Sequence, residues 1–138
     1  MDYHAVPQCV FGPLDLAQVG LTEAEAQSAG YAVRVGRFPL AASGRAQTLG
    51  ESEGIIKVVS EEKYGTLLGV HMLGPHTSEL LGEATLAISL EATVDELMHT
   101  LHMHPTISEG VLEAALDVKD LALHRPKRRL PVVATTLR

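Results

Sequence analysis

Apolar and polar positions follow strand-like patterns over much of the chain. Extended segments are predicted at Val6–Phe11, Leu16–Gly20, Tyr31–Phe38, Gly54–Ser60 and Thr66–Leu73. The last two are runs of β-branched and apolar residues separated by the polar stretch Glu62–Gly65, a pattern typical of an antiparallel hairpin. The stretch Ala41–Glu53 is expected to be irregular.

Three predicted helices begin with the same signature, T-x-x-E. In it, a threonine hydroxyl and a glutamate three residues later bind exposed backbone amides. The three boxes are Thr22–Glu25, Thr93–Glu96 and Thr106–Glu109. The first helix is expected to end at Gly30 and the last at Arg125-Pro126.

Two helices show an apolar face at helical spacing. Leu80, Leu81, Ala84, Ala87 and Ile88 form one face, and Val111, Leu112, Ala115 and Leu116 are expected to be buried in the last helix. Strands with one helix therefore come first, then a hairpin, then consecutive helices. This order lacks the βα alternation of a parallel sheet and predicts an α+β fold, an antiparallel sheet covered by helices.

Length and charge define the expected domain and its partners. The 138 residues fit one domain, which we place at residues 1–124, followed by a basic, solvated tail at 125–138. Residues 1–124 carry 17 acidic and six basic side chains, whereas the tail carries five basic ones. The net negative charge of residues 1–124 argues against nucleic acid as a partner, because phosphate binding needs a basic face.

The cysteine content and the hydropathy further restrict the class of protein that the sequence can encode. Cys9 is the only cysteine, so neither an intrachain disulfide nor a CxxC pair can form. We expect a cytoplasmic protein without a targeting segment or membrane span. No glycine-rich phosphate loop follows a predicted strand, so we expect no dinucleotide to bind by the usual fingerprint.

The most informative stretch is His102-Met103-His104-Pro105-Thr106-Ile107-Ser108-Glu109. Proline disfavours helical geometry at the residue before it, so His104 is predicted to be extended, just ahead of a helix. A carboxylate beside an imidazole fixes its tautomer and favours its protonated form. His104 and Glu109 could therefore act as a general acid–base pair near neutral pH.

Two other interpretations of these residues remain open. Glu109 could simply cap its helix, since the other two boxes have no histidine partner. Alternatively, His99, His102 and His104 could bind a metal together with Glu109, although zinc sites usually show tighter pairs or cysteines. The residue types and their spacing do not decide between these possibilities.

The motif H-x-H-P-T-x-S-E resembles the closing motif of the FAD-dependent pyridine nucleotide-disulfide oxidoreductases. With His102 as the first histidine, it is more similar to the dihydrolipoamide dehydrogenases than to the glutathione reductases. Further segments match in the family's order: Val6-Pro7, Val19–Glu23, Gly44–Ala46, Gly54–Lys57, Leu68–His71 and Leu73–Pro75. The resemblance covers roughly residues 3–120 and identifies a C-terminal dimerisation domain.

This resemblance implies a division of labour between two subunits. His104 would take a proton from a dihydrolipoamide thiol, Glu109 would orient and polarise it, and the His104-Pro105 backbone would approach the partner subunit's flavin. Electrons would pass from the thiols to a cysteine pair, then to FAD and to NAD+. The FAD- and NAD-binding domains of a parent enzyme would thus be further partners.

The sequence itself contains neither nucleotide-binding fold nor the redox cysteine pair. We therefore expect no bound cofactor and no metal in this chain, catalytic silence when it is alone, and a two-fold homodimer. Two alternatives are a free-standing homodimeric interaction module without catalysis and the metal-binding protein that uses the histidine cluster.

Overall fold

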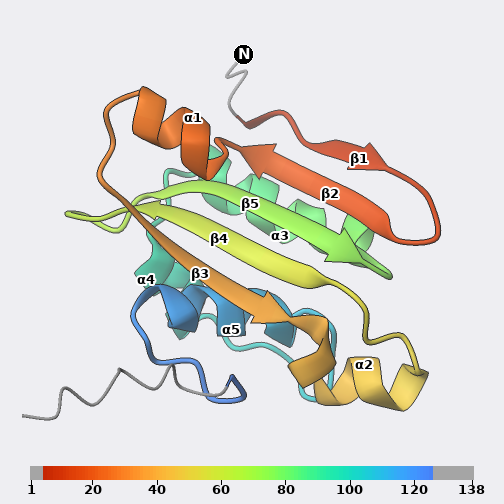
Figure 1. The fold of residues 1–138 in the computed structure, drawn as a ribbon. Coiled ribbons are helices and arrows are strands. Elements are labelled where there is room, and N and C mark those ends of the chain that lie inside the picture. Colours follow the sequence, from red (N-terminus) through yellow and green to blue (C-terminus); the bar gives the residue numbers. More distant parts are fainter. Residues whose placement is uncertain (1–4, 126–138) are drawn as a thin grey trace, which may run out of the picture.

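The computed structural model describes residues 5–125, and these form one antiparallel sheet with helices packed on it (Figure 1). The strands are β1 (Gln8–Val10), β2 (Asp15–Gly20), β3 (Val33–Pro39), β4 (Ile55–Glu61) and β5 (Leu67–Gly74). Their order across the sheet is β1-β2-β5-β4-β3, and every neighbouring pair is antiparallel. The predicted fold class and the β4–β5 hairpin are confirmed.

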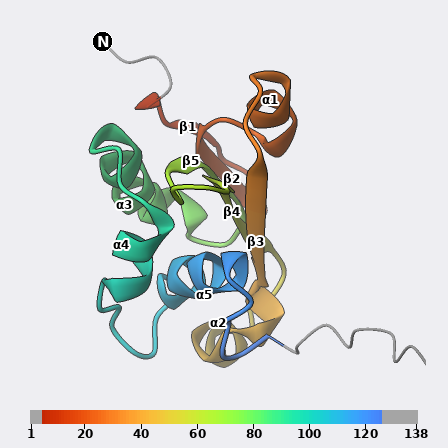
Figure 2. The same cartoon turned by 90° about the vertical axis from the view of Figure 1, so that its left-hand side faces the viewer.

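The helices are α1 (Glu23–Ser28), η2 (Leu40–Ala42), α2 (Gly44–Leu49), α3 (Thr77–Ser89), α4 (Val94–His99) and α5 (Glu109–Val118). α3 packs on β2 and β5, α5 packs on β3 and β4, and α4 contacts α5. The view along the sheet in Figure 2 shows α3 on one side and α1 on the other. Among residues 5–125, no helix has the length and apolar character that crossing a membrane requires.

The core lies between the sheet and helices α3 and α5. Alternate strand residues such as Val19, Val58 and Val70 are fully buried there, as their two-residue period requires. The opposite face of the sheet carries a continuous apolar row across the strands, because the register aligns Val10, Leu16, Leu73, Ile55 and Pro39. The row beside it is polar and consists of Gln8, Gln18, His71, Lys57 and Arg37.

The stretch Ala41–Glu53 contradicts its prediction as irregular, because it contains the end of η2 and all of α2. The Ser43 hydroxyl accepts a hydrogen bond from the Ala46 N–H at 3.3 Å, and Gly50 ends the helix with a φ of 74°. Both are ordinary helix-end signals. A helix of six residues shows too few apolar positions for its period to be recognised.

The last helix also ends earlier than predicted, at Val118 rather than at Arg125-Pro126. Asp120 adopts a φ of 58°, and the Leu121 N–H returns to the carbonyl of Leu116, the hydrogen bond that marks a Schellman motif. Glycine usually marks this position, so an aspartate there concealed the helix end. The buried face is shifted as well: Leu112 and Leu116 are half-buried, whereas the face is made by Gly110, Val111, Glu113, Ala114, Ala115 and Val118.

Other predicted helix ends are correct. α1 stops before Gly30, whose φ is 90°, and both reciprocal bonds of the Thr22–Glu25 box are formed. The Thr93–Glu96 box is formed too. Of the predicted basic tail at 125–138, only Arg125 is described, and it pairs with Asp117 of α5; residues 126–138 lie outside the described residues.

β3 and α5 pack so closely that Gly36 has no space for a side chain. A Cβ at this position would lie 1.9 Å from the Ala114 oxygen and 2.6 Å from the Val118 nitrogen. In the first turn of α5, a Cβ at Gly110 would lie 2.7 Å from Cδ1 of Ile56. These two glycines therefore set how closely α5 approaches the sheet.

We predict that Gly36→Ala lowers the free energy of unfolding by about 1–3 kcal/mol, because the new methyl group forces α5 away from β3. Urea denaturation followed by circular dichroism measures this change. Gly44→Ala is the matched control, since a Cβ there meets no atom within 4 Å. Equal stability of Gly36→Ala and Gly44→Ala would contradict the close packing of α5.

Candidate functional site

His104 lies in the loop between α4 and α5 and is largely exposed. Its side chain is 74% accessible, yet its Nδ1 lies 2.8 Å from Oε1 of Glu109 at the start of α5. The His104-Pro105 peptide bond is cis. The structure therefore brings together the two residues that the sequence singled out as a candidate pair.

Glu109 uses its two carboxylate oxygens for different partners. Oε1 faces His104, while Oε2 accepts the Thr106 N–H at 2.8 Å. The Glu109 N–H in turn donates to Oγ1 of Thr106 at 3.3 Å, which completes the predicted capping box. Capping and histidine binding therefore occur in the same residue, and the two interpretations do not exclude each other.

The charge state of Glu109 follows from these contacts. Partial burial alone would raise its pKa, but the hydrogen bonds from the Thr106 N–H and from His104 outweigh burial and lower the pKa overall. An ionised carboxylate can only accept, so the proton of the shared hydrogen bond lies on Nδ1 of His104. The other ring nitrogen, Nε2, makes no hydrogen bond to any residue between 5 and 125.

His102 lies two residues earlier, and its side chain is only 4% exposed. Its Nε2 lies 2.9 Å from Oε1 of Glu83 on α3, and its Nδ1 lies 2.9 Å from the carbonyl oxygen of Thr100. The hydrogen bond to Glu83 raises the pKa of His102 more than burial lowers it. This pair could not be predicted from the sequence, because nothing in the sequence links two residues that are 19 positions apart.

A second acidic residue of α5 holds the segment that follows the helix. The side chain of Glu113 is 4% exposed and accepts the backbone N–H groups of Leu123 and His124 at 3.0 and 3.1 Å. Its other oxygen lies 2.8 Å from Nδ1 of His124. His124, to which the sequence assigned no role, thus fastens the chain after α5 to the core.

Comparison with known proteins decides the family. The family model described as "Pyridine nucleotide-disulphide oxidoreductase, dimerisation domain" matches residues 6–115. The chain belongs to this family. Its matched region contains His104, Glu109 and both residues of the His102–Glu83 pair.

Members of the family in other organisms are similar along most of the chain. Dihydrolipoyl dehydrogenase of Thermus scotoductus is 53% identical over 119 residues, which are 86% of this chain and 26% of that enzyme. The Bacillus subtilis enzyme is 44% identical over 124 residues, 90% of this chain and 26% of that one. The chain therefore spans about a quarter of the length of these curated relatives.

Solved structures agree with this family assignment. LpdA of Mycobacterium tuberculosis superimposes with a TM-score of 0.78 and 28% identity, over 83% of this chain and 25% of that one. The HOCl-induced flavoprotein disulfide reductase RclA of Escherichia coli gives a TM-score of 0.76 and 26% identity, over 80% of this chain and 25% of that one. The resemblance inferred from the H-x-H-P-T-x-S-E motif is confirmed.

The metal site considered for the histidine cluster does not form in this dimerisation domain. Nδ1 of His99 lies 2.7 Å from the Asp95 carbonyl oxygen, whereas His102 and His104 turn to two different glutamates. Between residues 5 and 125, no three histidine, cysteine or acidic side chains gather as metal ligands would. The three histidines are therefore close in the sequence, but they do not gather into one site in the structure.

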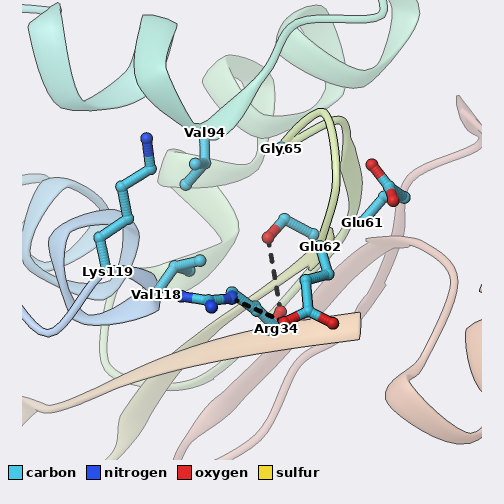
Figure 3. A pocket seen from close by; sticks show the side chains of 8 residues that line it. Arg34, Glu61, Glu62, Gly65, Val94, Val118 and Lys119 are labelled. Carbon is cyan, nitrogen blue, oxygen red and sulfur yellow. Dashed lines mark hydrogen bonds and ion pairs between the residues drawn. The ribbon is translucent and has the colours of Figure 1, made fainter. Parts of the chain in front are cut away.

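A hollow at the other end of α5 contains none of the candidate residues (Figure 3). Arg34 pairs with Glu62 at 3.3 Å, and Lys119 pairs with Asp95 at 2.6 Å. The carboxylate of Glu61, which also lines the hollow, accepts the backbone N–H groups of Lys63 and Tyr64. The neighbouring Val118 adds an apolar wall. Each charged side chain of the hollow thus already has a partner.

The raised pKa of His102 predicts how its contribution to stability depends on pH. A group whose pKa is higher in the folded state stabilises the protein fully below its unfolded pKa, and this stabilisation is lost as the pH rises through the folded pKa. We expect His102→Gln to lower the free energy of unfolding by about 1–3 kcal/mol near pH 6, because it removes the charged donor of Glu83. The loss should shrink as the pH rises.

Urea denaturation of both proteins between pH 6 and pH 9 measures this difference. Burial lowers the pKa of His71, but His71 is common to both proteins, so its contribution cancels from the difference. A stability gap that widens with rising pH would contradict the charged His102–Glu83 pair.

Proposed function

We propose that this domain supplies His104 and Glu109 as an acid–base pair to the flavin site of a partner subunit in a dihydrolipoamide dehydrogenase. One observation supports the proposal most: an imidazole is fixed on a carboxylate through Nδ1 while its Nε2 faces solvent. This arrangement suits a general base whose substrate is bound outside the domain.

The proposed step is a proton transfer from a thiol of dihydrolipoamide to Nε2 of His104. The thiolate that results is the nucleophilic form of sulfur. The imidazolium is stabilised by Glu109, whose carboxylate already binds Nδ1, so the ring need not rotate when it becomes charged. In the parent enzyme, the electron pair released as the dithiol closes to a disulfide would reduce the cysteine pair and would then pass to FAD and, as hydride, to NAD+.

The described residues do not fit a dinucleotide of their own. The usual fingerprint needs a strand, a glycine-rich turn and a helix within a parallel βαβ unit. Here every strand pair is antiparallel, and none of the strand-to-helix turns of residues 5–125 carries G-x-G-x-x-G. What fits a flavin is the exposed His104-Pro105 loop, which can approach a cofactor that another polypeptide segment holds.

Exposed apolar side chains on this loop and at the end of α3 make up the proposed homodimer interface. Leu86 on α3 and Leu90 at its C-cap follow Glu83 by three and seven residues and are 61% and 69% exposed. On the loop, Leu101 and Met103 flank His102 and are 97% and 76% exposed. The hydrogen bond from His102 to Glu83 ties this loop to α3.

A surface with several large exposed apolar side chains on a soluble protein is a candidate interaction site. A second copy would cover it with the same residues under two-fold symmetry, and His104 at its edge would then face the partner. The apolar row on the other face of the sheet, which runs from Val10 to Pro39, is proposed to contact the FAD- and NAD-binding domains of the parent enzyme. The two surfaces thus serve different partners.

We predict that the chain is a homodimer at micromolar concentration, with a mass twice the 14.8 kDa of one chain. An obligate interface of this type buries on the order of 2,000 Å² or more, so the dimer should persist on dilution. Light scattering coupled to size exclusion measures the mass.

Two charge-introducing variants of similar exposure locate the interface. Leu90→Glu should give a monomer, because it places a carboxylate in the apolar patch on α3. Val10→Glu changes a residue that is 64% exposed on the sheet face and should leave the dimer intact. A monomeric parent chain, or dissociation by Val10→Glu alone, would refute the proposed interface.

Catalysis is tested in a chimera in which residues 6–125 replace the matching segment of the Thermus scotoductus dihydrolipoyl dehydrogenase. We expect His104→Gln to lower dihydrolipoamide oxidation by NAD+ about 10²–10⁴-fold, the usual contribution of a positioned acid–base group. Electron transfer from NADH to a dye should fall less, because it needs no proton from a thiol.

His99→Gln is the matched control, since this ring lies on α4 and makes its only hydrogen bond to a backbone carbonyl within the described residues. It should leave both activities near those of the unaltered chimera. Equal loss of the thiol-dependent and dye-dependent activities in His104→Gln would show that His104 is structural rather than catalytic.

A further inference from the structure

We propose that Glu83 and His102 form a positioning pair that ties the His104 loop to α3. The inference rests on the proposed function, because it explains how the proposed acid–base residue is held in place. It assigns Glu83 and His102 no contact with substrate, and it concerns a pair that lies in no part of the proposed proton transfer.

The hydrogen bonds of His102 identify its charge state. Nε2 faces a carboxylate oxygen of Glu83 and Nδ1 faces the carbonyl oxygen of Thr100, each at 2.9 Å. Beside an ionised Glu83, both partners are acceptors, so both ring nitrogens must carry protons. His102 is therefore an imidazolium that makes two charge-assisted hydrogen bonds: one joins the loop to Glu83 of α3, and the other holds the ring on the Thr100 carbonyl at the end of α4.

The loop has few other side-chain anchors. From residue 101 to residue 105, the side chains of Leu101, Met103, His104 and Pro105 are exposed, and only that of His102 is buried. Thr106 adds a bond from its hydroxyl to the Met103 carbonyl at 2.7 Å, but this contact stays within the loop. Without the His102–Glu83 pair, residues 101–104 would have no side-chain bond to α3.

The two His–Glu pairs are also coupled electrostatically. Besides Glu83 and the Thr100 carbonyl, the charge of Glu109 contributes to the raised pKa of His102. The positive ring is thus stabilised mainly by the carboxylate of α3 and also by the carboxylate that orients His104. Loss of Glu83 should therefore disturb His104 as well as the loop backbone.

Nuclear magnetic resonance of the 138-residue chain tests the proposal without any enzymatic assay. Backbone relaxation reports order parameters for Leu101, Met103 and His104, and histidine ring ¹⁵N spectra report protonation and tautomer. Three variants are compared at pH 7: Glu83→Ala, Glu83→Gln and, as matched control, Glu79→Gln, which alters an exposed glutamate one turn earlier on α3. Light scattering and circular dichroism verify that each variant keeps the mass and fold of the parent.

In the parent chain, the order parameters of these three residues should be near 0.85, the value for rigid backbone, and they should fall below about 0.6 in Glu83→Ala. The His104 ring signals of Glu83→Ala should also shift toward those of a free imidazole. In Glu83→Gln, the amide can still bind the ring, so the loop should stay ordered while His102 becomes neutral. Glu79→Gln should match the parent in every signal.

Unchanged order parameters and His104 signals in a folded Glu83→Ala would overturn the proposal, as would a neutral His102 in the parent chain. If Glu83→Ala does not fold, Glu83→Gln decides, because a His102 ring whose protonation is insensitive to this variant cannot be paired with Glu83. These readouts do not depend on catalysis. Failure of the His104→Gln experiment would therefore leave them standing, and their failure would not remove the acid–base proposal.

Discussion

The division of the Glu109 carboxylate between two partners is the interaction on which the site depends. One oxygen accepts the Thr106 N–H in the turn that leads into α5, and the other fixes the ring of His104. Since the first oxygen is bound to the backbone and Glu109 is itself the first residue of α5, the second oxygen has a defined position in space. The position of the exposed His104 ring is therefore fixed relative to helix α5 and not only by its own loop.

The position of α5 in turn depends on the sheet. Gly36 allows the backbone of α5 to lie directly against β3, and Gly110 leaves room for the Ile56 side chain of β4. Close packing of this kind transmits displacement, because a well-packed interior has no free volume to absorb it. The geometry of His104 is therefore connected, through Glu109 and α5, to residues that contact neither a substrate nor a partner.

Much of this arrangement could be predicted from local pattern. The capping boxes are complete within four residues, and the T-x-x-E box at Thr106 lies next to His104-Pro105, so the candidate pair could be recognised. The hairpin followed from two β-branched runs with a polar turn between them. In contrast, α2 is too short to show a period, and α5 ends at an aspartate in the conformation that usually requires glycine.

Contacts between distant segments could not be predicted in the same way. Glu83 resembles any solvent-facing glutamate of an amphipathic helix until the fold brings His102 against it. The apolar row on the sheet is similarly spread over every strand, and only the register places its members side by side. Such features depend on topology, which local propensities do not contain.

The hydrogen bonds between His124 and Glu113 determine where the domain can be truncated without loss of stability. The family match ends at residue 115, yet the acceptor oxygens of this buried side chain are filled by residues 123 and 124. Excision at the family boundary would strand a carboxylate in the protein interior without donors, at a substantial cost in stability. The segment after α5 therefore belongs to the folding unit, and recombination between relatives must carry it along.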